Sequence, residues 1–263
     1  MTRTVTFPLQ LSWDEIAYLF ATLHARQFPG LDITLLPDDE EARKQTLQRG
    51  YEALRADGWL EEVEQDGRMY MDLNSWLLEY VAALADPEAV LAVTVRGAEG
   101  VSSGEVLIYF SDGKVLEVAP REEGLWIQAV ATMAGALRGL ADRLRLPQRD
   151  PAQLEVVLSQ QEAKALAEGR EISQYEIDAN NQVALSKLIE TRQHLLLTAQ
   201  ILLMKVRGGD VQDGHSAGLL VGGQKELLGW WMEIEAEQVH YITCDRKMFQ
   251  NRLQEAIAAY MID

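Results

Sequence analysis

The segment Gly214-His215-Ser216-Ala217-Gly218 fits the Gly-x-Ser-x-Gly pattern of a hydrolase nucleophile. That pattern requires a strand that runs directly into a sharp turn and is followed by a helix. Here a polar stretch, 208–213, comes before the motif and a strand-like stretch, 219–221, follows it. The downstream histidine, His240, also comes before Asp245, which reverses the order of acid and histidine in such enzymes. We interpret the motif as a glycine-rich loop leading into a strand, and keep a serine hydrolase at Ser216 as an alternative.

Other chemistry has even less support in the residue spacing. The four histidines are His24, His194, His215 and His240, and no two of them have the short spacing of paired metal ligands. The glycine-rich patterns that cradle nucleotide phosphates do not occur in the sequence. We therefore expect no catalytic residue, no metal and no cofactor, and we expect that the protein is not an enzyme.

The adjacent tryptophans Trp230 and Trp231 are the most unusual local feature. Neighbouring residues of a strand point to opposite faces of the sheet, so the two indoles cannot share one core face. One interpretation is that helices cover both faces of this strand. The other is that one indole is an aromatic anchor for a protein partner.

A pattern of strands occurs twice along the chain, over 89–118 and 196–243. Each copy opens with an apolar strand that ends in Val-Arg-Gly, at Gly97 and at Gly208. Each then returns as short strands and is followed by an amphipathic helix, expected over 125–146 in the first copy. Repeats of this kind pack against each other, because neither copy buries its apolar face alone. The pattern predicts an α+β fold, with a mainly antiparallel sheet flanked by helical bundles in a pseudo-two-fold arrangement.

The boundary between the two halves is expected at Pro147–Pro151. It separates an N-terminal half, 1–150, from a C-terminal half, 151–263, packed together as one compact unit. The second half should open with helices over 152–168 and 174–192.

A helix over 38–58 is followed by two short strands around Asp66-Gly67, a dipeptide typical of hairpin turns. Helix plus hairpin resembles the recognition helix and wing of a winged-helix transcriptional regulator, which we keep as an alternative function. The hairpin is acidic, whereas contacts to DNA phosphates require lysine and arginine.

Composition limits the partners. The 263 residues include 41 acidic and 24 basic side chains, a formal net charge of −17, which disfavours nucleic acid. No run of about 18 apolar residues occurs, so we expect no membrane insertion. The N-terminus does not have a signal-peptide pattern and Cys244 is the single cysteine. Both features favour a reducing cytoplasm.

The layout resembles the EspG-type secretion-specificity chaperones of mycobacterial ESX (type VII) secretion. The segments that carry the resemblance are 11–16 (Leu-Ser-Trp-Asp-Glu-Ile), 54–59 (Leu-Arg-Ala-Asp-Gly-Trp), 76–78 (Trp-Leu-Leu), 84–88 (Leu-Ala-Asp-Pro-Glu) and 218–221 (Gly-Leu-Leu-Val) with the later tryptophans. The resemblance implies a cytosolic, non-enzymatic protein that holds the helical tip of PE–PPE type substrates and keeps them soluble. This chain differs from the family in a polar helix at 174–192 and a longer Gly-Asp loop after Val206.

We expect a protein partner, such as a helical secretion substrate, to bind at the second copy and its loop, 208–216. Glycine and aspartate make that loop exposed, as binding loops commonly are. The adjacent apolar residues would supply anchors. The expected partner-binding residues are Met204, Gly209, Asp210, Asp213, Trp230 and Trp231.

Overall fold

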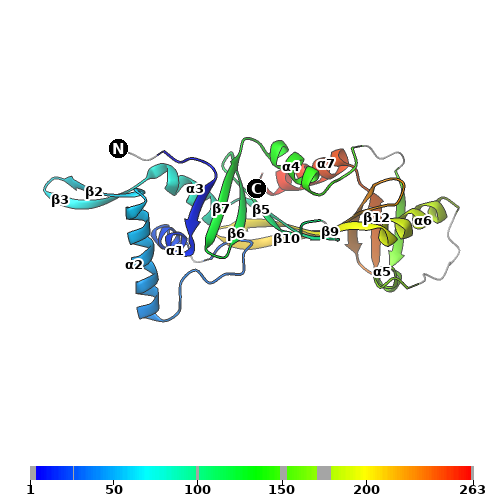
Figure 1. The fold of residues 1–263 in the computed structure, drawn as a ribbon, viewed down its shortest axis with the longest axis horizontal. Helices are drawn as coiled ribbons and strands as arrows, with labels where there is room; N and C mark the ends of the chain where they lie inside the picture. Colours follow the sequence, from blue (N-terminus) through cyan, green and yellow to red (C-terminus); the bar gives the residue numbers. More distant parts are fainter. Residues whose placement is uncertain (1–3, 26, 99–100, 149–152, 171–178, 262–263) are drawn as a thin grey trace. The chain divides into compact units, whose positions relative to one another are not determined.

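The computed structural model describes residues 4–25, 27–98, 101–148, 153–170 and 179–261. Ten strands form a sheet in the order β1-β7-β6-β5-β4-β9-β10-β11-β12-β8, and β2 and β3 form a separate hairpin (Figure 1). The strands are β1 Leu9–Ser12, β2 Leu60–Gln65, β3 Arg68–Leu73, β4 Ala89–Gly97, β5 Gly104–Ser111, β6 Lys114–Arg121, β7 Gly124–Val130, β8 Glu155–Ser159, β9 Leu195–Arg207, β10 Asp210–Gly222, β11 Leu228–Glu235 and β12 Gln238–Thr243. The helices are α1 Trp13–Thr22, α2 Glu40–Ala56, α3 Ser75–Ala85, α4 Met133–Arg143, α5 Gln160–Ala167, α6 Ala179–Gln193 and α7 Arg246–Met261.

The chain folds into two compact units. The first contains 1–91, 106–132 and 204–214, and the second contains 92–105, 133–203 and 215–263. Four of their boundaries fall inside the strands β4, β5, β9 and β10, which contribute residues to both units. These units are groups of residues that contact one another, and each combines separate segments of the chain. They therefore differ from the two halves expected on either side of residue 150.

The strand order is mirrored about β4 and β9, as a pseudo-two-fold arrangement requires. The strands β5, β6 and β7 follow on one side, and β10, β11 and β12 on the other. Beyond them lie the two edge strands, β1 next to β7 and β8 next to β12, and each edge strand leads directly into a helix with a capping box. In β1–α1 the Ser12 hydroxyl accepts from the Glu15 amide, and in β8–α5 Ser159 does the same with Glu162. The α+β fold with a mainly antiparallel sheet is therefore confirmed, while superposition of the two halves stays a prediction.

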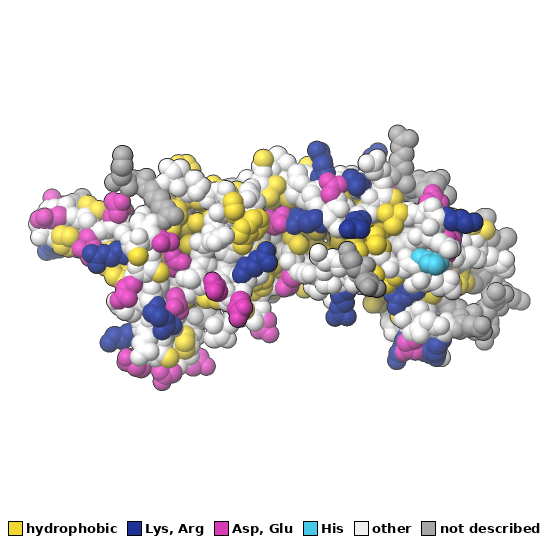
Figure 2. Space-filling model, viewed as in Figure 1, with side chains coloured by type: hydrophobic (Ala, Val, Ile, Leu, Met, Phe, Trp, Pro, Cys, Tyr) yellow, Lys and Arg dark blue, Asp and Glu magenta, His cyan; other side chains and the backbone are white. Residues whose placement is uncertain are grey.

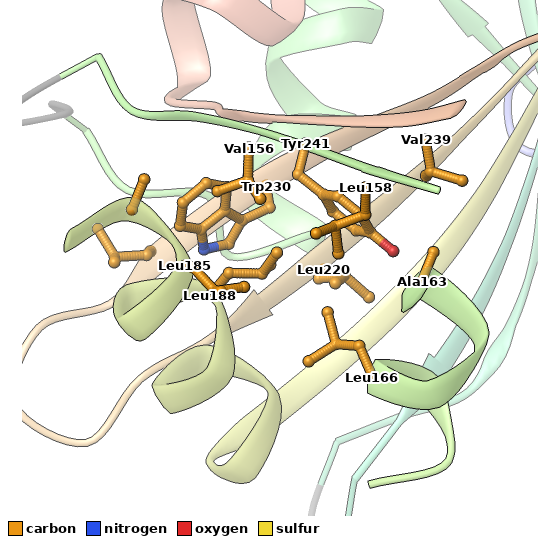
Figure 3. Packing of buried hydrophobic residues seen from close by; sticks show 12 residues of the cluster. Val156, Leu158, Ala163, Leu166, Leu185, Leu188, Leu220, Trp230, Val239 and Tyr241 are labelled. Carbon is orange, nitrogen blue, oxygen red and sulfur yellow. The ribbon is translucent and has the colours of Figure 1, made fainter. Parts of the chain in front are cut away.

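In the second unit, one face of the sheet packs against α5 and α6. Trp230 of β11 lies in this layer with Tyr241 of β12, facing Leu185 and Leu188 of α6 (Figure 3). The indole NH donates to the Thr191 hydroxyl at 3.0 Å, so its polar atom is paired within the core.

Trp231 lies on the opposite face and packs under α7. Its ring meets Phe249 edge to face, with 6.0 Å between centroids, and the Arg252 guanidinium lies 5.7 Å above it. The same helix pairs with α4 through an ion pair between Arg246 and Asp142. Helices therefore cover both sides of β11, which confirms the first interpretation of the tryptophan pair.

The first unit has an aromatic centre. Phe20 of α1 stacks on Phe28 at 5.0 Å, and Phe28 meets Tyr109 of β5 edge to face at 5.6 Å. The buried Tyr109 hydroxyl donates to the Pro29 carbonyl at 2.6 Å. This cluster fixes the segment after α1 against the sheet.

Two predicted helices are wrong in part. Residues 124–130 form β7, paired antiparallel with β6, and the helix begins only at Met133. Residues 155–159 form β8, paired with β12, and α5 follows from Gln160. In both segments the cross-strand ladder outweighs helical propensity, which is a weak preference compared with tertiary pairing. The start of the helix predicted over 174–192 lies outside the described residues, and α6 is described from Ala179.

Replacing Gly50 tests the packing of α1 on α2. A Cβ at Gly50 would lie 2.1 Å from the Asp14 carbonyl oxygen, whereas at Gly139 of α4 the nearest atom is 4.0 Å away. We expect Gly50→Ala to lower the free energy of unfolding by about 1–3 kcal/mol, as overpacking does. Gly139→Ala should raise it by about 0.5–1 kcal/mol, because alanine favours helix. Urea denaturation measures both, and equal effects of the two variants would contradict this packing.

The buried tryptophans allow a second test. We expect Trp230→Ala and Trp231→Ala each to lower the free energy of unfolding by about 3–5 kcal/mol, through lost contacts and the remaining cavity. Trp76 of α3 is 59% exposed, so Trp76→Ala is the matched control, with an expected change within about 0.5 kcal/mol. A mild effect at Trp230 or Trp231 would mean that its indole is not part of the core.

Candidate partner-binding site

The candidate site lies at the turn of the β9–β10 hairpin. The turn residues Gly208 and Gly209 have φ angles of 61° and 80°, which is the backbone of a type I′ turn. Residues from Asp210 onward belong to β10, so the predicted loop over 208–216 is wrong. Pairing with a neighbouring strand satisfies the hydrogen-bonding groups of the backbone here, and the polar side chains of 210–216 are exposed on both faces.

Hydrogen bonds within the first unit hold this turn in place. The Gly209 amide donates to the Asp86 carboxylate at 3.0 Å. The Gln27 side-chain amide donates to the Asp210 carboxylate at 2.6 Å. The turn is therefore tied both to the end of α3 and to the segment that follows α1.

A hollow of about 600 Å³ lies beside the turn. Leu23, Ala82 and Ala85 give it an apolar part. Its polar part is formed by His24, Gln27, Asp86 and Asp210. Two carboxylates beside an apolar surface suit a group that is cationic or donates hydrogen bonds, such as a lysine or arginine side chain of a protein.

The structure brings some of the expected partner-binding residues together and separates others. Gly209 and Asp210 line the hollow, and Asp213 is exposed further along β10. Met204 is 6% exposed, and its methyl group packs close to Gly30 in the core of the first unit. Trp230 and Trp231 are 0% and 2% exposed and belong to the core of the second unit. Burial thus gives these three apolar residues a role in packing, and the anchors expected on the surface are not on it.

Sequence reasoning missed several residues of the site. Val211 is half exposed between Asp210 and Asp213, and supplies an apolar side chain on the hairpin. A signal for it existed, because Gly-Gly after an apolar run is typical of a hairpin turn. No local signal could have indicated His24, Gln27 or Asp86, which reach the turn only through tertiary folding.

A charged network covers the edge of Trp231 in the second unit. The Glu233 carboxylate accepts from the Trp231 indole at 2.6 Å and from Arg252 at 2.8 Å, and His215 lies 3.8 Å away. Burial by itself raises the pKa of Glu233. The hydrogen bonds from Trp231 and Arg252 and the nearby positive charges outweigh this effect and leave the pKa below its ordinary value of 4.5.

The serine hydrolase alternative does not fit the local geometry. Ser216 lies inside the continuous strand β10, whereas a nucleophile elbow needs a sharp turn from strand to helix. His215 faces Glu233, so the adjacent Ser216 points to the opposite face of the sheet. His240 pairs with Glu233 in the register of β11 and β12 and shares its face, away from Ser216.

The winged-helix alternative has the predicted elements, α2 and the β2–β3 hairpin, but three of their five basic side chains are engaged. Arg49 forms a two-point contact with Asp14, and Arg55 pairs with Glu62 at 3.3 Å. Arg43 donates to the Pro37 and Asp38 carbonyls. This surface therefore offers poor contacts for DNA phosphates.

Comparisons with known proteins point to one fold. No family model and no curated protein matches the sequence. A solved structure of the Mycobacterium tuberculosis type VII secretion system chaperone EspG5, in complex with the PE25-PPE41 dimer, matches over 94% of this chain and 94% of that chain. The TM-score is 0.58 at 11% sequence identity. The chain therefore has an EspG-like fold, as the resemblance in the sequence predicted.

Two further observations concern the described residues. None of the helices they form is long and apolar enough to span a membrane. Within the same ranges, no three His, Cys, Asp or Glu side chains come together as a metal site would require.

The lowered pKa of Glu233 predicts how stability depends on pH. A carboxylate whose pKa is lower in the folded state stabilises the fold above its unfolded pKa, near 4.5. This contribution is lost as the pH falls through the folded-state pKa. We expect the difference in unfolding free energy between wild type and Glu233→Gln to be constant above about pH 5.5 and to shrink below pH 4.5. Denaturation at a series of pH values measures it, and a difference that grows on acidification would contradict the network.

Proposed function

We propose that the protein is a non-enzymatic cytoplasmic chaperone or adaptor that binds a helical protein partner. The observation that carries the proposal is the likeness in fold to the EspG5 chaperone, which extends over nearly the whole length of both chains. In that solved structure the chaperone is in complex with a PE25-PPE41 dimer. A protein of similar secretion-substrate type is the partner that we propose for this chain.

The chain's own properties support a role in keeping a partner soluble. Its net charge of −17 disfavours aggregation and would be shared with a bound partner. The single cysteine, Cys244, is buried, which suits a reducing compartment.

The proposed contact surface is the β9–β10 turn with the start of β10. Gly209, Asp210 and Asp213 remain the proposed partner-binding residues, joined by the half-exposed Val211. Hydrogen bonds to Asp86 and Gln27 fix the turn, so little conformational freedom would be lost on binding. The carboxylates favour a partner surface that carries lysine or arginine. Met204, Trp230 and Trp231 would act indirectly, by holding the strands.

The proposal predicts that the tagged chain, purified from its native cells, retains a stoichiometric partner with mainly helical circular dichroism. Mass spectrometry identifies the partner, and reconstitution from separately purified proteins measures the affinity. A protein that elutes alone under all native conditions, or a partner without helical structure, would contradict the proposed function.

The same complex tests the location of the surface. We expect Val211→Ser with Asp213→Arg to weaken partner binding at least about tenfold, because an apolar contact and a charge are both changed. The matched control is Ile234→Ser with Glu237→Arg on the β11–β12 hairpin, where both side chains are also exposed. Equal effects of the two double variants would contradict partner binding at the β9–β10 surface.

A further inference from the structure

The β2–β3 hairpin carries an unusual share of exposed apolar side chains. The described residues include ten large hydrophobic side chains that are exposed, and five of them fall between residues 63 and 76. Four of them, Val63, Met69, Tyr70 and Met71, lie on the hairpin, and the fifth, Trp76, lies in α3 just after it. Exposed apolar residues concentrated in one element indicate an interaction site more strongly than the same number scattered singly.

Charge is concentrated on the same hairpin. Between Leu60 and Leu73 five carboxylates stand against one arginine, a net charge of −4. Figure 2 shows acidic side chains at the end of this hairpin beside hydrophobic ones. The carboxylates are those of Glu61, Glu62, Glu64, Asp66 and Asp72.

The base of the hairpin is held firmly. Trp59 and Leu60 are buried, and the Asn74 amide donates to the Trp59 carbonyl at 2.9 Å. Arg55 pairs with Glu62 at 3.3 Å, and the Tyr51 hydroxyl donates to the Met71 sulfur at 3.7 Å. The turn, Asp66-Gly67, has φ angles of 53° and 73°, as a type I′ turn requires. The hairpin therefore presents a preformed strand edge.

The register sorts the side chains of β2 by face. Val63 pairs with Tyr70, and both lie on one face. Glu62 and Glu64 pair with Met71 and Met69 on the other face. Along β2, the apolar Val63 therefore lies between Glu62 and Glu64, whose side chains point to the opposite face of the hairpin. In the described part of the chain, no third strand pairs with this hairpin.

We propose that the outer edge of β2 binds an extended protein segment in which lysine or arginine alternates with apolar residues. The segment adds as a third strand, so that its backbone pairs with the free edge. Its basic side chains then lie across from Glu64 and from Glu62, which they share with Arg55, and its apolar side chains extend the row formed by Val63 and Tyr70. This inference does not depend on the proposed function.

Charge favours a basic protein segment at the edge of β2 over a second copy of the chain or an anionic membrane. A second copy of the chain would bring another hairpin of net charge −4 against the first, and like charges across a strand pair are unfavourable. An anionic membrane surface would be repelled by the same carboxylates. A basic segment is attracted.

The test uses a fluorescein-labelled peptide of ten residues in which lysine and valine alternate. A peptide of the same composition, with its lysines and valines in two separate blocks, controls for charge without pattern. Fluorescence anisotropy measures the dissociation constant of each peptide for the full-length protein. We expect the alternating peptide to bind at least about tenfold more tightly than the block peptide, and less tightly as salt is added.

Variants locate the binding. We expect Glu62→Lys with Glu64→Lys, and separately Val63→Ser with Tyr70→Ser, each to weaken binding of the alternating peptide at least about tenfold. The control, Glu226→Lys with Glu237→Lys, changes the net charge by the same amount at exposed positions of the second unit. It should leave binding within about twofold. Circular dichroism checks folding, and the single variant Glu64→Lys replaces any double variant that unfolds.

Three results would overturn the proposal. The first is equal weakening by the hairpin variants and the control, which would show binding to the general acidity of the protein. The second is self-association in sedimentation experiments that Val63→Ser with Tyr70→Ser abolishes, which would make a second copy the occupant. The third is tight binding to vesicles of phosphatidylserine that the same variant abolishes.

Discussion

A strand with large apolar side chains on both faces is stable only where a layer of helices covers each of them. β11 has this property, because its consecutive residues Trp230 and Trp231 must point in opposite directions. α5 and α6 cover the first indole, and α7, paired with α4, covers the second. The arrangement of the second unit follows from this requirement, including the hydrogen bond from Trp230 to Thr191 and the network around Glu233.

Because helices must cover both faces of β11, its large apolar side chains serve packing, and partner recognition is left to other surfaces. The largest apolar side chains of the second sheet copy lie inside the fold, so they have no surface to offer a partner. Two exposed surfaces are candidates for recognition. One is the polar, glycine-rich β9–β10 turn, and the other is the β2–β3 hairpin. Both surfaces are fixed by hydrogen bonds at their base, and both are acidic. Partners with basic side chains suit each of them.

Much of the fold could be predicted from periodicity and turn chemistry. Asp66-Gly67 correctly indicated a hairpin. The tryptophan pair left two interpretations open, and the burial of both indoles agrees with the one in which helices cover both faces of the strand. The mirrored order of strands around β4 and β9 agrees with the arrangement expected from the two copies.

The errors have a common cause. Residues 124–130 and 155–159 and the polar start of β10 are strands only because another strand pairs with them. Such pairing joins residues far apart in the chain and leaves little trace in local composition. For the same reason, the contacts of Asp86 and Gln27 with the β9–β10 turn could not be predicted from the sequence. The partner-binding role expected of Gly209 and Asp210 stays a prediction.

We propose that a helical protein partner binds at the β9–β10 turn. Amide hydrogen exchange, compared between the free protein and the complex purified from its native cells, tests this most directly, because it reports protection along the whole backbone. We expect slower exchange on partner binding in the segment 208–216, with exchange in core strands such as β11 unchanged. Unchanged exchange over 208–216, together with new protection elsewhere in the chain, would contradict it.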